Sequence, residues 1–216
     1  MLVLLDLDGT LTDPFAGISA GIRYAFEHLG VPVPHETVLR SMIGPPFQDT
    51  FPALGIPRHQ IDDAIAAYRS VYDDGGKLFE ATVYDGIEHA LDTLLEHGHT
   101  LALATSKPEG PARRIVEHFA ILDRLTFVGA ATADGTRRHK ADVIEHVLRS
   151  TGVHPAGAVM VGDRNVDVLG ARAHGLQVIG VRWGYSDEGE LDELHPTAII
   201  QHPVELPGAV AAIANW

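Results

Sequence analysis

The sequence predicts an α/β fold: a Rossmann-like parallel sheet core with helices on both faces, and a small all-helical domain inserted after the first strand. Two observations predict it. From residue 81 onward, short apolar runs alternate with amphipathic segments, which is typical of repeated βαβ units. Between residues 14 and 80, apolar residues instead recur at helical intervals.

The first element is an apolar strand within "LVLLDLDGT", interrupted by Asp6. Apolar residues then follow helical spacing from Phe15 to Leu29 and from Ile61 to Tyr72, and glycines come soon after both series. No second strand is expected until about residue 100. The sequence therefore predicts a helical domain at residues 14–80 and a core formed by residues 1–13 and 81–216.

The core elements follow in order along the chain. Helices are expected in "DGIEHALDTLLEHG", around Ile115, around Val143 to Leu148, in "NVDVLGARAHG" and at the alanine-rich C-terminus. Strands are expected in "TLALAT", "LTFVGA", "GAVMVGD", "LQVIGV" and "TAII".

Composition excludes several classes of function. Sixteen Lys and Arg against 29 Asp and Glu give a net charge of −13, which opposes binding to nucleic acid or to an acidic membrane. The chain has no cysteine, so thiolate catalysis and disulfides are excluded. The N-terminal apolar run is short and lacks a basic leader, so we expect that it is neither a signal peptide nor a membrane anchor. We therefore expect a cytoplasmic protein.

Carboxylates stand at the ends of the predicted strands. Asp6 and Asp8 are two residues apart, so in a strand both would face one spot at its C-terminal edge, where open parallel sheets bind ligands. Thr105 and Asp163 end other strands at the same edge, and Asp167 follows Asp163 by one helical turn. Four converging carboxylates require a cation, and oxygen ligands suit Mg²⁺.

Each motif taken alone has an ordinary interpretation. A D-x-D at a strand end can be a turn, "GDRNVD" can be a glycine turn with an aspartate cap, and "ATSKP" has common turn composition. Their placement in order at the ends of successive strands favours a single functional site.

These motifs resemble a known family. "DLDGT", "LALATS", the lysine of "RRHKADVI" and "VGDRNVD" are similar to the four signature motifs of the haloacid dehalogenase superfamily of phosphohydrolases, and the resemblance spans essentially the whole chain. The helical insertion resembles the small helical cap of that superfamily, of the C1 type. "GVRWGYSDEGEL" followed by "HPVEL" resembles the tail of its phosphoglycolate phosphatase-like branch.

The resemblance implies roles that spacing does not distinguish. Asp6 would be the nucleophile that becomes an aspartyl phosphate, and Asp8 the acid and base. Thr105 would bind the phosphoryl oxygens, and Lys140 would neutralise charge. Mg²⁺ would be held by Asp6, the backbone carbonyl of Asp8 and Asp163, with Asp167 as a direct or indirect ligand.

The implied function is a Mg²⁺-dependent phosphomonoester hydrolase. Asp8 argues against a dehalogenase, and the lack of lysine between Asp13 and Gly76 argues against a phosphonate hydrolase that uses a cap lysine. A phosphomutase of the same fold stays open as an alternative. A non-catalytic binding domain would be expected to have lost at least one of the motif residues, and none is missing.

The substrate is expected to be a small phosphorylated metabolite, either a 5'-nucleotide or phosphoglycolate-like, acted on by a monomer or a homodimer. Ala141 after Lys140, and Arg164 beside Asp163, look more like 5'-nucleotidase-like members of the branch. The candidate substrate contacts are Ser106, Lys107, Arg23, Gly44 and Arg164. The acidic stretch "DEGELDE" is interpreted as the solvated start of a helix.

Overall fold

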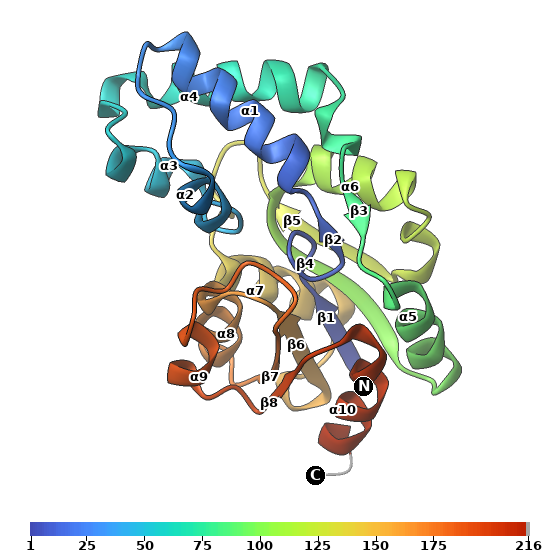
Figure 1. Ribbon diagram of the computed structural model, residues 1–216. Helices are drawn as coiled ribbons and strands as arrows, with labels where there is room; N and C mark the ends of the chain where they lie inside the picture. Colours follow the sequence, from blue (N-terminus) through green and yellow to red (C-terminus); the bar gives the residue numbers. More distant parts are fainter. Residues whose placement is uncertain (215–216) are drawn as a thin grey trace.

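The computed structural model describes residues 1–214. Its core is a six-stranded sheet in the order β5-β4-β1-β6-β7-β8 (Figure 1). Every neighbouring pair is parallel, so the predicted α/β class with a parallel sheet is confirmed. The strands are β1 (Leu2–Leu5), β4 (Thr100–Pro108), β5 (Phe127–Ala131), β6 (Ala158–Gly162), β7 (Gln177–Val181) and β8 (Ala198–Ile200).

Helices cover both faces of the sheet. Successive side chains of a strand point to opposite faces, and because both faces are apolar, each packs against helices in its own apolar cluster. In β1, Val3 and Leu5 belong to one cluster, and Leu2 and Leu4 belong to the other. Helices α5 (Ile87–Glu96), α6 (Glu109–His118) and α10 (Leu206–Ala214) contribute to the first cluster. Helices α7 (Lys140–Thr151), α8 (Asn165–Arg172) and α9 (Glu190–Leu194) contribute to the second.

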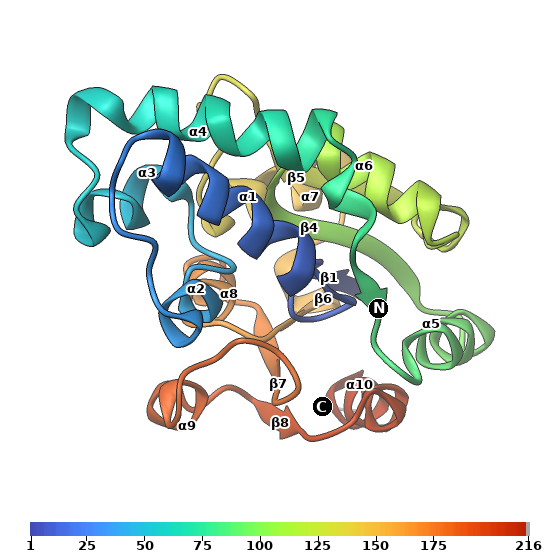
Figure 2. The same cartoon turned by 45° about the horizontal axis from the view of Figure 1, so that its top comes forward.

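The helical insertion follows the first strand, as the sequence predicts, and lies beyond the carboxyl ends of the parallel strands (Figures 1 and 2). Within it, the buried Ile22 and Phe26 of α1 are one helical turn apart, which confirms the periodicity of that segment. Its helices are α1 (Phe15–His28), α2 (Glu36–Ser41), α3 (Phe47–Thr50), α4 (Ile61–Arg69) and the π-helical turn η3 (Ser70–Asp74), with short 3₁₀ turns η1 (Pro52–Leu54), η2 (Arg58–Gln60) and η4 (Lys77–Phe79).

Two short strands join the insertion to the core. β2 (Thr12–Asp13) and β3 (Thr82–Val83) pair antiparallel where the chain leaves the core and where it returns. The expectation of no strand before about residue 100 is therefore wrong. Two residues are too few to display the alternation by which a strand is recognised, and the pairing depends on the two ends of the insertion meeting.

One further detail bears on the sheet edge. β4 continues three residues beyond its predicted end at Thr105, because an irregularity in its pairing with β5 brings Pro108 opposite Ala131.

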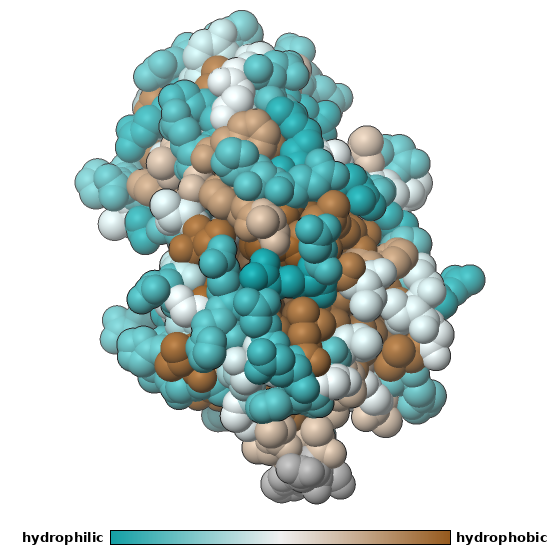
Figure 3. Space-filling model, turned by 90° about the vertical axis from the view of Figure 1, so that its right-hand side faces the viewer, coloured by the Kyte–Doolittle hydropathy of each residue, from teal (hydrophilic) through white to brown (hydrophobic). Residues whose placement is uncertain are grey.

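The face in Figure 3 is mostly hydrophilic, and its apolar side chains gather where the helical insertion meets the core. No helix within residues 1–214 is both long enough and apolar enough to cross a membrane.

Candidate active site

The candidate site lies at the carboxyl edge of the sheet, below the helical insertion. Asp6 follows β1, whose last residue Leu5 is in register with Leu103 of β4 and Val161 of β6. That register brings the ends of three central strands side by side, so Asp6, Thr105 and Asp163 come from adjacent strands. A cavity of about 580 Å³ opens there, with walls from both the sheet edge and the insertion.

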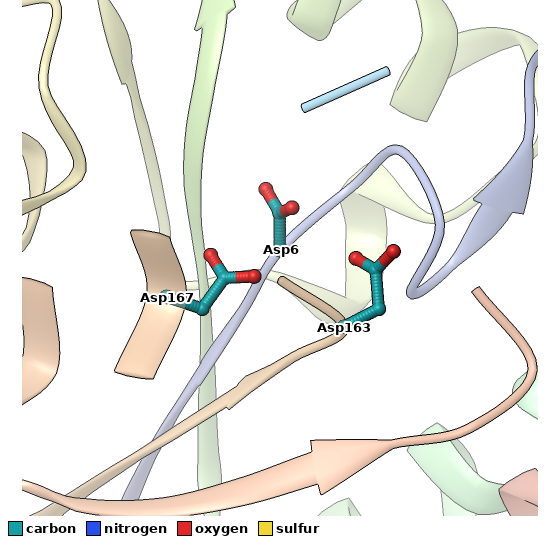
Figure 4. Close-up of side chains that lie close together, drawn as sticks. All are labelled: Asp6, Asp163 and Asp167. Carbon is teal, nitrogen blue, oxygen red and sulfur yellow. The ribbon is translucent and has the colours of Figure 1, made fainter. Parts of the chain in front are cut away.

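Three buried carboxylates meet at this edge. One oxygen from each of Asp6, Asp163 and Asp167 lies within 4.8 Å of the others, and the side chains point toward one another (Figure 4). Asp163 and Asp167 are 0% exposed and Asp6 is 4% exposed. The cluster is tightly enclosed: a Cβ at Gly9 would lie 2.2 Å from Asp163 Oδ2, and Gly9 has a φ of +89°.

Hydrogen bonds orient two of these carboxylates. Asp163 Oδ1 accepts from Thr10 Oγ1 at 3.2 Å, and Asp163 Oδ2 accepts from the backbone N–H of Tyr185 at 2.7 Å. Asp167 Oδ2 accepts from the backbone N–H of Arg164 at 3.0 Å. Tyr185 lies in the loop after β7, so a segment distant in sequence also fixes the cluster.

Lys140 pairs with two of the three carboxylates. Its Nζ lies 2.7 Å from Asp6 Oδ1 and 2.7 Å from Asp167 Oδ1, and it donates to the carbonyl of Ala104 at 2.9 Å. As the first residue of α7, Lys140 is buried, with 3% of its surface exposed. The coulombic attraction of both carboxylates outweighs burial and raises the pKa of Lys140, so its ammonium stays charged.

The charges of the cluster do not balance. Burial, followed by repulsion from Asp167 and Asp6, raises the pKa of Asp163 well above its usual value, and burial raises the pKa of Asp167 to about 6. One lysine thus faces three carboxylates. A hard divalent cation bound by carboxylate oxygens would restore the balance, so the donor set fits the Mg²⁺ expected from the sequence.

Asp8 lies on the same cavity, but its carboxylate is not part of this cluster. Of the four carboxylates expected to converge, three form the close cluster, and Asp8 shares only the cavity with Asp6. The reason is local: the chain turns after Leu7, whose carbonyl accepts from the N–H groups of Leu11 and Thr12, so strand alternation does not extend to Asp8. Asp8 Oδ2 instead pairs with Lys107 Nζ at 2.5 Å.

The other oxygen of Asp8, Oδ1, is buried and has no hydrogen-bond partner among the described residues. Burial raises the pKa of Asp8, while the coulombic attraction of Lys107 lowers it in part. A carboxyl group that lines a cavity and has a raised pKa suits general acid and base chemistry.

The remaining predicted contacts divide between those in the cavity wall and those outside it. Thr105, Ser106, Lys107 and Gly44 all line the cavity. Arg23 is exposed on α1 and does not line it, because Ile22 and Phe26 occupy the buried face of that helix. The expectation of a substrate contact at Arg23 is therefore corrected.

Arg164 also lies outside the cavity wall. It is 5% exposed and hydrogen-bonds to backbone carbonyls of the insertion. Its expected substrate contact is therefore corrected too: the side chain spans the core and the insertion instead of facing the cavity.

Aromatic side chains that were not predicted as site residues form part of the cavity wall. The rings of Phe47 and Tyr68 lie 4.6 Å apart between centroids, and those of Tyr68 and Tyr72 lie 5.0 Å apart. Lys107 Nζ lies 4.9 Å from the centre of the Tyr72 ring. Helical periodicity identifies Tyr68 and Tyr72 only as buried positions, so it does not indicate that they face a ligand.

Comparisons with known proteins agree with this geometry. Residues 3–181 match the model of the haloacid dehalogenase-like hydrolase family. The chain is 41% identical to the tyrosine-protein kinase PtkA of Mycobacterium tuberculosis over 198 residues, covering 92% of this chain and 67% of PtkA. It is 40% identical to a 5'-nucleotidase of Pseudomonas aeruginosa over 196 residues, covering 90% of this chain and 88% of that protein.

A solved structure extends the similarity to the whole fold. The crystal structure of a predicted phosphatase from Clostridium acetobutylicum superposes with a TM-score of 0.92 at 33% identity, covering 98% of each chain. Together with the family match, this agrees with the resemblance carried by the strand-end aspartates and Lys140. The chain belongs to the haloacid dehalogenase-like hydrolases, within their phosphatase branch.

Proposed function

We propose that this protein is a Mg²⁺-dependent phosphomonoester hydrolase that works through an aspartyl phosphate on Asp6. The observation that carries the proposal is the buried cluster of Asp6, Asp163 and Asp167, two of which pair with Lys140, beside a cavity that Asp8 also lines. We further propose residues 14–80 as the cap domain and residues 1–13 with 81–216 as the core.

In the first half of the reaction, Asp6 attacks the phosphorus atom and the leaving oxygen takes a proton from Asp8. The ion pair with Lys140 holds the Asp6 carboxylate in place and offsets the negative charge that collects around it. Thr105, at the neighbouring strand end, lines the cavity where the phosphoryl oxygens would bind. The covalent step divides one difficult hydrolysis into two easier ones.

In the second half, water attacks the phosphorus of the aspartyl phosphate and Asp8 takes a proton from the water. The bond between phosphorus and the Asp6 oxygen breaks, which releases orthophosphate and restores the Asp6 carboxylate. Asp8 suits both steps because Lys107 fixes one of its oxygens and leaves the other free. Asp6, Asp163 and Asp167 would hold Mg²⁺, together with the backbone carbonyl of Asp8. When bound, the ion supplies charge neutralisation on the phosphoryl oxygens.

The cavity bears on the class of substrate. Its volume of about 580 Å³ lies within the range of sites for ligands much larger than a two-carbon acid. Aromatic and apolar side chains of the insertion form its wall, which favours a leaving group with a flat ring. Of the two substrate classes expected from the sequence, a 5'-nucleotide therefore fits better than a phosphoglycolate-like acid.

The proposal is tested by phosphate release from p-nitrophenyl phosphate with Mg²⁺. We expect turnover in Mg²⁺ that is lost in EDTA, and an Asp6→Asn variant slower by at least about three orders of magnitude. Asp123→Asn, at an exposed residue outside the cavity, is the matched control and should retain full activity. Near wild-type activity in Asp6→Asn would refute the mechanism.

Two further measurements separate the alternatives. A panel of nucleoside 5'-monophosphates, sugar phosphates and phosphoglycolate should give the highest kcat/KM for a nucleotide. Transfer of the phosphoryl group to a sugar hydroxyl, with no release of orthophosphate, would instead identify a phosphomutase.

A further inference from the structure

Arg164 connects three parts of the molecule although it stands next to the carboxylate cluster. Its backbone N–H donates to Asp167 Oδ2 at 3.0 Å. Its NH1 group donates to the carbonyl of Ile43 at 2.7 Å and to that of Ser41 at 3.3 Å. One residue of the core thus touches both a carboxylate of the cluster and the backbone of the insertion, 121 to 123 positions away in sequence.

Glu190 fixes the guanidinium from the other side. Its Oε1 accepts from Arg164 Nε at 3.1 Å and from the backbone N–H of Asn165 at 2.6 Å, and its Oε2 accepts from the N–H of Asp187 at 2.9 Å. The side chains of Arg164 and Glu190 are 7% and 10% exposed. The interpretation of "DEGELDE" as a solvated helix start is therefore wrong for Glu190, which begins α9 but is a partly buried ion-pair partner of Arg164.

The backbone that Arg164 holds forms part of the cavity wall. Met42, Ile43 and Gly44, here called the 42–44 loop, all line the cavity. Gly44 has a φ of +111°, and a Cβ at this position would lie 3.2 Å from Arg164 Cγ. A glycine is needed for that conformation and for the close approach of the arginine stem.

One other contact between core and insertion lies near this loop: the Arg40 guanidinium is 5.4 Å from the centre of the Tyr185 ring. Further contacts lie elsewhere. Lys107 lies against Tyr72, and Arg114 NH1 donates to the carbonyl of Asp73 at 3.3 Å. Both contacts involve η3, the opposite end of the insertion from the 42–44 loop. Arg164 therefore fixes a different wall of the cavity from the one fixed by Lys107 and Arg114.

We propose that Arg164 is a positioning residue for substrate selection. Its hydrogen bonds hold the 42–44 loop in the position in which the loop contacts the leaving group. The inference rests on the proposed phosphatase function and adds the residue that sets the shape of its leaving-group pocket. The guanidinium suits this task because its fixed fork of donors reaches the carboxylate of Glu190 and the loop carbonyls together. A lysine ammonium is a single point of charge on a flexible stem and cannot span both.

The test variant is Arg164→Met, which keeps an unbranched stem beside Gly44 and removes the donors. With p-nitrophenyl phosphate as the probe, we expect KM to rise about tenfold with kcat nearly unchanged, the fold-change of one lost charge-assisted hydrogen bond. The inhibition constant of orthophosphate should stay within about twofold of wild type, because orthophosphate has no leaving group to contact the loop. Arg164→Lys should give an intermediate KM.

A second readout does not depend on activity. Amide hydrogen exchange in a peptide covering residues 40–47 should become at least about fivefold faster in Arg164→Met, while a peptide from α4 keeps its wild-type rate. Arg149→Met is the matched control: Arg149 belongs to an exposed pair with Glu145 on α7 and does not line the cavity. Thermal unfolding of each variant confirms that it is folded.

Three outcomes would overturn the proposal. The first is an unchanged KM together with unchanged exchange in the 40–47 peptide. The second is a parallel rise in KM and in the orthophosphate inhibition constant, which indicates general damage to the site. The third is an equal effect in Arg149→Met. If the wild-type enzyme hydrolyses no phosphomonoester, the proposed function fails, and the exchange measurement alone then tests whether Arg164 holds the 42–44 loop.

Discussion

The buried pair between Lys107 and Asp8 allows a quantitative prediction about stability. Lys107 Nζ and Asp8 Oδ2 are 2.5 Å apart, and the two side chains are 6% and 11% exposed. Lys107→Met keeps most of the apolar stem and removes the ammonium group. Asp8 is then left as a buried carboxylate that has lost its partner, a change that costs about 3–5 kcal/mol when the charge stays in place.

The size of the loss depends on pH. Burial already raises the pKa of Asp8, and loss of the attraction of Lys107 raises it further. The pKa of Asp8 is about 4 in the unfolded chain and higher in the folded variant. At pH values between these two, Asp8 is protonated in the folded state and ionised in the unfolded state. The stability of the variant therefore falls as the pH rises through this window. The deficit of Lys107→Met should therefore be small at pH 5 and approach its full value at pH 8.

Urea unfolding in EDTA at pH 5 and pH 8 measures both deficits. The double variant Asp8→Asn with Lys107→Met should recover most of the stability at pH 8, because no buried charge is left. Lys77→Met is the control: Lys77 and Glu80 form a pair that is 39% and 49% exposed, so its loss should cost less than about 1 kcal/mol. Equal deficits of Lys107→Met at both pH values, or one below about 1 kcal/mol at pH 8, would refute this reasoning.

The remaining predictions concern metal, packing and charge. Mg²⁺ at about 100 times its Kd should raise the Tm by about 5–10 °C in calorimetry, and Asp163→Asn should abolish that rise; an equal rise in this variant would place the ion elsewhere. Gly129→Ala puts a Cβ 2.2 Å from Val147 Cγ2. Urea unfolding should therefore show that the free energy of unfolding falls by about 1–3 kcal/mol. Wild-type stability would mean that α7 shifts to accommodate the added methyl group without cost. Lys140→Met should lower kcat by at least about a hundredfold with p-nitrophenyl phosphate, whereas a change confined to KM would contradict its role beside Asp6.

The local pattern was sufficient for most of the fold. Parallel strands buried on both faces are continuous apolar runs, so "LALAT" and "AVMVG" are visible without the structure. Helical spacing in the insertion likewise marks Ile22 and Phe26 as buried. The strand-end positions of Asp6, Thr105 and Asp163 indicated one site, because the carboxyl ends of parallel strands share an edge.

Features that depend on contacts between distant segments could not be predicted in this way. β2 and β3 are two residues each and exist because the ends of the insertion meet. Asp8 turns away from the cluster because the chain bends after Leu7. The pairing of Arg164 with Glu190 joins residues 26 positions apart that no local pattern connects.

The family of this protein and the sheet edge that carries its carboxylates follow from the sequence, whereas the pairing of those carboxylates follows from the tertiary structure. Strand alternation and apolar runs are short-range properties, so they specify which carboxylates reach the sheet edge. Three features depend on distances between segments remote along the chain: which carboxylates lie close enough to hold a cation, which one pairs with Lys107, and which arginine binds the 42–44 loop. The first two depend on the register of the core strands and on the turn after Leu7, and the third depends on the packing of the insertion against the core. Local spacing encodes none of these.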